Sequence, residues 1–463
     1  MTTKRIPELD VFRGIAVLLV MGYHPAAHYT LAGRSRPLAY IWQVSGWMGV
    51  DLFFVLSGFL IGGLLFDELE RNKTLDVRRF IIRRIFKIWP AYFVLVTFFF
   101  LWYFIKGYPF YNWPVTLAML PNLAHLQNYV PTLAVHTWSL AVEEHFYLVL
   151  PLALMWIHKP MTRRAALSIA AISFALIFLL LILVKKSVIS AVATGIIQTD
   201  LLGYYKSYTH TGFMWIFGLQ LFAYALWFLA SRLWRISLPV WIIGMLAMCL
   251  SFRMTVAATY MRFEADPSWP AYSTHLRLDS LLFGVLLAYG LRFAPNALIA
   301  IQRRRLLILC VCIFALILVV FWPFGGWFTG LIVDRTVIYL ASGGILIAAL
   351  PSPGHTSAAL SLPAKVVAWI GFYSYSIYLW HVNPARYALI DWLRAYTQSW
   401  VILTCVYIMV SLILGVVLGK LVEWPMLRLR DRLFPAQVFS PNVGSTTRTL
   451  PRPGAERMEE TAS

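Results

Sequence analysis

The chain has 463 residues, of which 60% are hydrophobic and only 13% are charged, and its formal net charge is +19. A soluble globular domain has about a quarter of its residues charged, so this composition excludes a large soluble domain and indicates a membrane protein. The basic residues lie in short loops between apolar runs with no nucleic-acid-binding motif, so we expect no nucleic acid partner.

Long apolar runs recur along the whole chain. Runs of about 18 or more residues with few charges are typical of membrane-spanning helices. They predict an all-α integral membrane protein, a polytopic helical bundle of about 10–12 transmembrane helices. The twelve expected spans are 11–29, 44–66, 88–106, 138–157, 166–184, 212–230, 238–256, 275–294, 306–322, 333–350, 366–383 and 400–422.

The basic residues orient these spans. With the N-terminus inside, 27 of the 39 Lys and Arg residues fall in inside loops or at the adjoining helix ends. The positive-inside rule then places both termini in the cytoplasm. We expect residues 1–433 to form one membrane-embedded domain. Residues 434–463, rich in Pro, Ser, Thr, Arg and Glu, are expected to form a disordered cytoplasmic tail.

Several ionisable residues lie inside the expected spans, near their outer ends. Such groups are costly in a membrane and are functional candidates by default. At about 1.5 Å per residue they fall within an outer slab on the order of 10 Å deep. The alternative is that side chains at helix ends simply reach interfacial water. The residues in this slab are His24, Asp51, Glu143, Glu144, His145, Arg277, Asp279 and His381.

A buried histidine beside a carboxylate is the arrangement that general base chemistry needs. The carboxylate fixes the imidazole tautomer and stabilises the imidazolium that forms when the ring accepts a proton. His24 paired with one of the carboxylates would suit removal of a proton from a hydroxyl group. The candidate carboxylates are Asp51, Glu143 and Glu144.

The cytoplasmic side carries basic residues instead. Arg13 lies in the first turns of the first span, on the same helix as His24 and about 16 Å from it along the axis. Just before the third span, basic residues spaced four apart share one helix face. Such a cluster can bind phosphate groups, and the alternative is topological anchoring or contact with anionic lipid. The candidate phosphate-binding residues are Arg79, Arg83, Arg84 and Lys87.

Seven motifs follow one another along the expected spans. They are Arg5–Ala16 with Arg13 and His24 separated by ten residues, Gly49–Ile61, Phe80–Tyr92, Trp138–Tyr147, Arg277–Asp279 followed by Gly284, Ser374–His381, and Glu423–Pro425. In this order they resemble the motifs of the membrane-bound acyltransferase-3 family, whose members acylate bacterial surface sugars and some small metabolites. One match would be weak, but seven in order are specific.

The resemblance implies a cytoplasmic acyl-CoA donor, often acetyl-CoA, and a location in the bacterial cytoplasmic (inner) membrane. It implies His24 as the catalytic histidine, Arg13 as its support, and the basic motif around Arg83 and Lys87 as the donor site. Many relatives have about ten spans, so the pair 212–256 departs from the pattern. Some relatives carry an extracytoplasmic esterase-like domain, which we do not expect in this chain.

The expected function is transfer of an acyl group, acetyl in the simplest case, to a hydroxyl of a cell-envelope carbohydrate, a lipid-linked sugar or a similar acceptor. We expect membrane lipids around the protein and no metal, since no metal-ligand spacing is present. Both direct transfer and an acyl-histidine intermediate remain open. A transporter or flippase for a glycan precursor or lipid is the alternative function, because intramembrane charges also mark transport paths.

Overall fold

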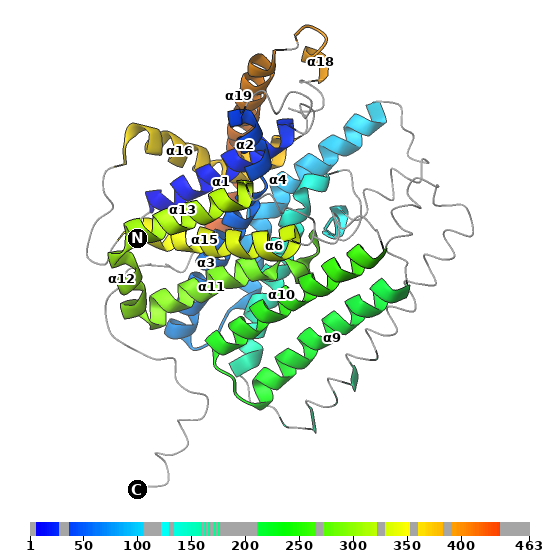
Figure 1. Ribbon diagram of the computed structural model, residues 1–463, viewed down its shortest axis with the longest axis vertical. Coiled ribbons are helices and arrows are strands. Elements are labelled where there is room, and N and C mark those ends of the chain that lie inside the picture. The colour runs from blue at the N-terminus through cyan, green and yellow to red at the C-terminus, as the bar shows by residue number, and fades with distance from the viewer. Residues whose placement is uncertain are drawn as a thin grey trace. The chain divides into compact units, whose positions relative to one another are not determined.

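The structure is a computed structural model of the chain. It describes residues 6–26, 37–105, 122–128, 134–158, a few positions within 162–175, 211–263, 272–321, 329–351, 360–382, 391–397 and 399–435. Within these ranges every regular element is a helix (Figure 1). The chain divides into two compact units. Unit 1 comprises Met1–Lys106, Phe283–Phe324 and Asp334–Thr447, and unit 2 comprises Gly107–Leu282, Gly325–Val333 and Arg448–Ser463.

The described helices divide between these units. Those of unit 1 are α1 (Pro7–Ala26), α2 (Pro37–Ser45), α3 (Met48–Asn72), α4 (Val77–Ile105), α12 (Pro295–Arg303), α13 (Arg305–Phe321), α15 (Arg335–Ala349), α16 (Leu362–Phe372), α17 (Ser374–Trp380), α18 (Asp391–Leu393), α19 (Trp400–Leu418), the π-helix η7 (Gly419–Glu423) and α20 (Trp424–Leu433). Those of unit 2 are η2 (Val135–Thr137), α6 (Trp138–His158), α9 (Thr211–Leu233), α10 (Leu238–Phe263) and η4 (Thr274–Leu276). Two elements continue from unit 2 into unit 1, namely α11 (Leu278–Phe293) and the π-helix η5 (Gly330–Asp334).

Among the described residues, six helices are long and apolar enough to cross a membrane, and the bent pair of α11 and α12 makes a seventh if it counts as one span. The six are Tyr40–Asn72, Val77–Trp102, Trp138–Ile157, Leu238–Ala258, Gly330–Ala349 and Trp400–Leu433. The expectation of an all-α protein with many spans is confirmed. The expected span 166–184 lies largely outside the described residues, so the count of twelve stays a prediction.

Helix α1 is the centre of unit 1, with α2, α3 and α16 packed against it (Figure 1). Helix α17 contacts it as well. A Cβ atom at Gly371 of α16 would lie 1.8 Å from the carbonyl oxygen of Asp10, and one at Gly14 would lie 2.1 Å from that of Val367. The backbones of α1 and α16 therefore touch, as they do in membrane helix pairs with small interface residues. Because Asp10 meets Gly371 and Gly14 meets Val367, the two helices are antiparallel.

Substitution of Gly371 tests this contact. We expect Gly371→Ala to lower the stability of the folded protein by about 1–3 kcal/mol, because the added methyl group must push two backbones apart. Gly419→Ala is the matched control, since its Cβ atom would meet only side-chain atoms, at 3.2 Å and beyond. The thermal midpoint in detergent measures both variants, and equal midpoints would contradict the close packing.

The expected span 366–383 is two helices, α16 and α17, rather than one. Gly371 lies beside Asp10, whereas His381 lies beside His24. The chain therefore reverses its direction along α1 between these two helices. The sequence pattern predicted one span because both helices are apolar and no charged residue marks the turn between them.

Helix α4 begins earlier than the expected span 88–106. The backbone N–H of Arg79 donates a hydrogen bond of 2.9 Å to the Asp76 carboxylate, which caps the helix start. The whole basic stretch therefore lies on α4 and continues without a break into the apolar part of the same helix.

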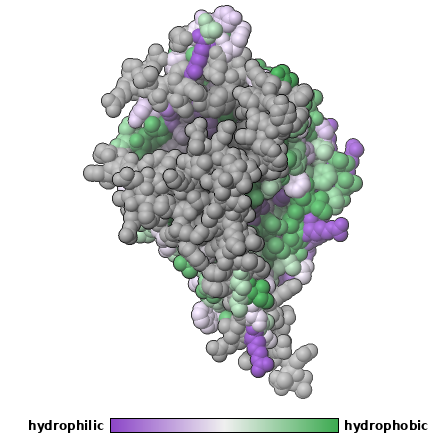
Figure 2. Space-filling model, turned by 90° about the vertical axis from the view of Figure 1, so that its right-hand side faces the viewer, coloured by the Kyte–Doolittle hydropathy of each residue, from purple (hydrophilic) through white to green (hydrophobic). Residues whose placement is uncertain are grey.

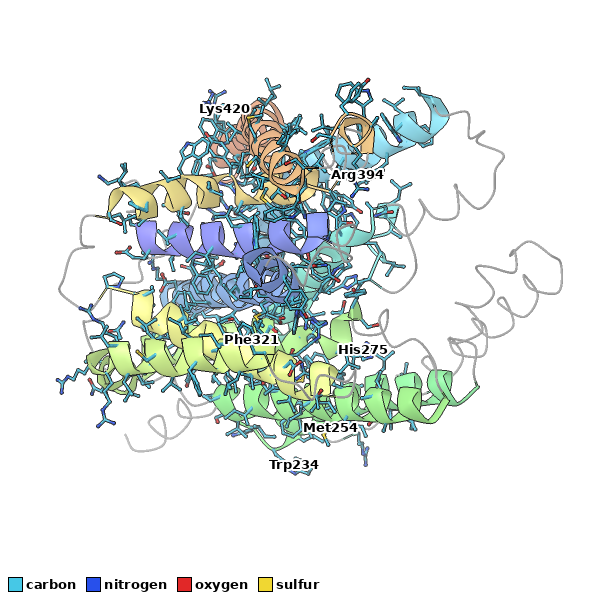
Figure 3. The ribbon with its side chains drawn as sticks, turned by 45° about the horizontal axis from the view of Figure 1, so that its top comes forward. Trp234, Met254, His275, Phe321, Arg394 and Lys420 are labelled. Atoms are coloured by element: carbon cyan, nitrogen blue, oxygen red, sulfur yellow. The ribbon has the colours of Figure 1, made fainter. Side chains whose placement is uncertain are left out.

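Exposed apolar side chains fit a membrane environment in both units. Helix α13 of unit 1 has no buried residue and presents Leu306, Val311 and Phe314 at its surface. In unit 2, α9 and α10 lie side by side (Figure 1), and Trp234 and Met254, labelled in Figure 3, are exposed. Many described residues visible on the face drawn in Figure 2 are hydrophobic. Apolar surfaces of this kind mark contact with lipid.

Candidate functional site

Two histidines meet at one end of α1 in unit 1. His24 lies in the last turn of α1, and His381 directly follows α17. The Nε2 atom of His381 is 3.1 Å from Nδ1 of His24, and the rings cross at 76° with centroids 4.7 Å apart. His381 is fully buried, whereas His24 is partly exposed. His24 is thus the more solvent-accessible member of the pair.

Backbone carbonyl groups hold both rings. The Nδ1 atom of His381 is 2.6 Å from the carbonyl oxygen of Tyr378, and Nδ1 of His24 is 3.1 Å from that of Val20. The sequence placed both histidines in one outer slab but did not pair them. Their pairing joins positions that are 357 residues apart in the chain.

Asp51 of α3 lies beside a different part of α1 from the part that carries His24. It is fully buried on α3, with Oδ2 3.9 Å from the guanidinium of Arg335. Gly49, two residues earlier, packs against Ala16, which lies about 12 Å from His24 along α1. Pairing of Asp51 with His24 therefore stays a prediction, while its ion pair with Arg335 is what this geometry provides.

A cationic cluster surrounds the other end of α1. Arg13 forms a 3.0 Å ion pair with Asp10, one turn earlier. Lys87 of α4 lies within electrostatic range of Arg13, Arg84 and Arg430, and of one acidic partner, Glu423. Arg430 comes from α20, and the sequence did not predict it as part of this cluster. Basic side chains from three helices thus converge at the end of α1 opposite the histidine pair.

Helices α17 and α1 link the cluster to the histidine pair. The hydroxyl of Ser376 donates a hydrogen bond of 2.7 Å to the carboxylate of Glu423, and the hydroxyl of Tyr375 donates one of 2.6 Å to the carbonyl oxygen of Ile88. These bonds fix the start of α17, whose end carries His381. The cationic cluster and the histidine pair therefore lie on connected helices of unit 1.

The remaining predicted phosphate ligands contact the end of α20. Arg83 forms a 3.1 Å ion pair with Asp431 and a hydrogen bond to the carbonyl oxygen of Phe434. Arg79 donates to the carbonyl oxygen of Pro435. The predicted set of four thus divides. Arg79 and Arg83 connect α4 to the end of α20, whereas Arg84 and Lys87 are members of the cationic cluster.

The two predicted glutamates lie on α6 of unit 2, whereas both histidines belong to unit 1. Glu143 accepts a hydrogen bond of 2.7 Å from the hydroxyl of Tyr147. The carboxylate of Glu144 contacts the imidazole of His125, and Nδ1 of His145 is 2.7 Å from the hydroxyl of Thr274. The acidic pair is therefore part of a polar network within unit 2, and its pairing with His24 stays a prediction.

Unit 2 also buries an ion pair. Arg253 of α10 and Asp279 of α11 are both inaccessible to solvent, and their charged atoms are 2.7 Å apart. The guanidinium of Arg277, also fully buried, lies over the Trp138 ring at 5.5 Å. Nearby in sequence, the side chain of His275, labelled in Figure 3, is buried as well. Within the described ranges, no group of three or more His, Cys, Asp or Glu side chains is placed to hold a metal ion.

A many-span helical protein with a cationic cluster at one end of a helix and a histidine pair at the other has the parts of a membrane enzyme for group transfer. The profile of the family described as an acyltransferase domain matches residues 6–300, more than half of the chain. The chain therefore belongs to the acyltransferase-3 family, which confirms the resemblance of its motifs, and its class of enzyme is acyltransferase.

Three relatives are similar over part of their length. The peptidoglycan O-acetyltransferase OatA of Listeria monocytogenes is 31% identical over 178 residues, 34% of this chain and 26% of the relative. The putative peptidoglycan O-acetyltransferase YrhL of Bacillus subtilis is 32% identical over 182 residues, 35% and 26% of the two chains. The O-acetyltransferase OatA of Staphylococcus aureus is 30% identical over 169 residues, 33% and 25%. The chain thus spans about a quarter of the length of these relatives. No solved structure matches it.

Proposed function

We propose that this protein is an O-acyltransferase of the bacterial cytoplasmic membrane, with both termini in the cytoplasm. It moves an acyl group, acetyl in the simplest case, from acyl-CoA to a hydroxyl of a cell-envelope carbohydrate. The observation that carries the proposal is α1 itself. It connects Arg13 in the cationic cluster with His24 in the histidine pair, about 16 Å along one helix.

The cationic cluster suits the donor. Acyl-CoA combines a phosphate-rich head with a long pantetheine arm that ends in the thioester. Charge-assisted hydrogen bonds from Arg and Lys are strong ligands for phosphate. With the phosphates at Lys87, Arg84 and Arg13, the arm follows α1 toward His24. The cluster thus gives the transfer a direction, from the cytoplasmic end of α1 toward its outer end.

His24 supplies the base for the chemical step. The acceptor hydroxyl attacks the thioester carbonyl carbon while His24 takes the hydroxyl proton. The tetrahedral intermediate then collapses, the carbon–sulfur bond breaks, and the imidazolium returns the proton to the CoA thiolate. General base assistance of this kind contributes about 10²–10⁴-fold to a rate. Asp51, Glu143 and Glu144 stay predicted catalytic carboxylates.

The relatives support the proposed class of acceptor. Two of the proteins that match over part of this chain are named as acting on peptidoglycan, which supports a carbohydrate acceptor here. A lipid-linked sugar presents the same hydroxyl chemistry. Mass spectrometry of envelope glycans from a deletion strain identifies the acceptor, because the missing acyl mass appears on one glycan component.

Transfer by the protein itself is tested in liposomes that contain it and an envelope glycan acceptor. Labelled acetyl-CoA is added, and release of free CoA thiol is followed together with label on the glycan. We expect equal amounts of thiol and acylated glycan. Movement of glycan across the membrane without CoA release would overturn the proposal in favour of a transporter.

Substitution of Lys87 tests the donor site. We expect Lys87→Gln to raise the KM for acetyl-CoA about tenfold or more, with kcat little changed, because one charged hydrogen bond to phosphate contributes about 1.5–3 kcal/mol. Steady-state kinetics with varied acetyl-CoA measure the change. With S-acetyl pantetheine, which has no phosphate, the variant and the wild-type protein should have the same KM.

Arg78→Gln is the matched control for this substitution. It removes the same charge from the same helix, but Arg78 is exposed and precedes the predicted set. We expect its KM for acetyl-CoA to stay at the wild-type value. A KM increase for both variants would indicate a general charge effect at the membrane surface, and the assignment of Lys87 would be wrong.

A further inference from the structure

We infer that His381 is the positioning residue for His24: it fixes the tautomer in which Nε2 of His24 carries the lone pair that accepts the substrate proton. The inference rests on the proposed function and adds to it a residue that acts through His24. It also gives the base a neutral partner where the sequence predicted a carboxylate.

The proton of His381 is placed by its backbone contact. Its Nδ1 atom lies 2.6 Å from the carbonyl oxygen of Tyr378, and a carbonyl oxygen can only accept a hydrogen bond. Nδ1 therefore carries the proton and donates it to Tyr378. In a neutral imidazole the second nitrogen is then an acceptor, so Nε2 of His381 presents a lone pair toward His24.

The tautomer of His381 in turn determines the tautomer of His24. Its Nδ1 atom faces two acceptors, Nε2 of His381 at 3.1 Å and the carbonyl oxygen of Val20 at 3.1 Å. A lone pair on Nδ1 would face two other lone pairs, so Nδ1 must carry the proton. The lone pair of His24 is then on Nε2. The hydrogen bonds run in one direction, from His24 to His381 and from His381 to Tyr378.

The surroundings of His381 hold its ring in place. The residue is fully buried, and its backbone N–H donates a 3.0 Å hydrogen bond to the carbonyl oxygen of Ile377. The Tyr378 ring lies 5.5 Å away and itself meets Phe53 at 6.4 Å. A group held this way needs no reorganisation when His24 accepts a proton. The bond from Nδ1 of His24 then becomes charge-assisted and strengthens, which favours the step.

Two substitutions at His381 separate positioning from packing. His381→Leu removes the imidazole acceptor for the Nδ1 proton of His24 and leaves the carbonyl oxygen of Val20 as its one remaining acceptor of the two. His381→Gln instead supplies an amide oxygen to accept this proton and an amide N–H₂ for Tyr378. We expect kcat about 100-fold below wild type for the Leu variant and within about tenfold for the Gln variant. The KM for acetyl-CoA should change less than twofold in both, since the phosphates bind at the other end of α1.

Ser374→Ala is the control for packing of α17. Ser374 is buried on the same helix, and within the described part of the chain no hydrogen bond joins it to either histidine ring. We expect its kcat to equal that of the wild-type protein. Size-exclusion profiles of all variants report folding, so kinetics are compared per folded molecule.

The outcomes distinguish this inference from the proposed function. Transfer by the wild-type protein with a wild-type kcat in His381→Leu would overturn the role of His381 alone. A Gln variant as slow as the Leu variant at equal folded yield would overturn it as well. Absence of any acyl transfer by the wild-type protein would overturn the proposed function, and this inference with it.

Discussion

Replacing His24 with alanine is expected to lower the turnover of acyl transfer by up to about 10⁴-fold while the protein stays folded and inserted. The ring is the partly exposed member of the histidine pair, at the end of α1. Its removal leaves Lys87 and the cationic cluster in place, so acetyl-CoA should still bind. Label transferred to glycan in proteoliposomes measures turnover, and binding of acetyl-CoA by calorimetry measures the donor site.

His24→Asn is the second variant, because it separates the base from the hydrogen bond. The asparagine amide can donate toward Val20 and His381 as the imidazole does, but it cannot accept a proton from an alcohol. We expect it to be as inactive as His24→Ala. Near-wild-type turnover in either variant would show that another group is the base. Mass spectrometry of the wild-type protein quenched with labelled acetyl-CoA then tests for an acyl group on His24, which direct transfer does not leave.

The sequence predicted the positions of the apolar helices well where charged or capping residues delimit them. The expected span 138–157 is α6 (Trp138–His158), and 306–322 is α13 (Arg305–Phe321). The sequence pattern predicted one helix instead of two where one apolar helix follows another without a charged residue between them, as in α16 and α17. The sequence pattern also ended the last span at residue 422. In the structure the helices continue through η7 and α20 to Leu433, because basic residues end an apolar run without ending a helix.

The candidate site could be predicted only along single helices. The spacing of Arg13 and His24 requires no tertiary information, since a helix rises by about 1.5 Å per residue. Contacts between distant segments have no such signal. His381 and Arg430 therefore remained unassigned as partners of α1, although His381 was already in the outer slab. The preference for a carboxylate beside a catalytic histidine also left out the second histidine that lies next to His24 in the structure.

Arg253 could have been recognised from the sequence as a residue that needs a buried partner. It is a lone charge within the expected span 238–256, and such a residue needs a partner in a membrane. The structure pairs it with Asp279, one of the ionisable residues of the outer slab. This pair joins α10 to α11 and is fully buried. It therefore predicts a large effect on stability rather than on chemistry.

Asp279→Asn is expected to destabilise the folded protein by about 3–5 kcal/mol, because it leaves the buried guanidinium of Arg253 without a counter-charge at nearly unchanged side-chain volume. The thermal midpoint and the folded yield in detergent measure the loss. Asp431→Asn is the matched control, since Asp431 is about half exposed in its ion pair with Arg83. An exposed pair contributes about 0–1 kcal/mol, so this variant should unfold close to wild type.

The double variant Arg253→Met with Asp279→Leu separates the charge from the packing. Removing both charges leaves nothing unpaired, and replacement of a buried ion pair by apolar residues is often neutral or stabilising. We expect the double variant to recover most of the stability that Asp279→Asn loses, a coupling that a double-mutant cycle measures directly. If Asp279→Asn is as stable as the wild-type protein, the two charges are not paired in the membrane. If the double variant is as unstable as the single one, Asp279 stabilises the fold through contacts other than Arg253, and the junction of α10 and α11 depends on shape rather than charge.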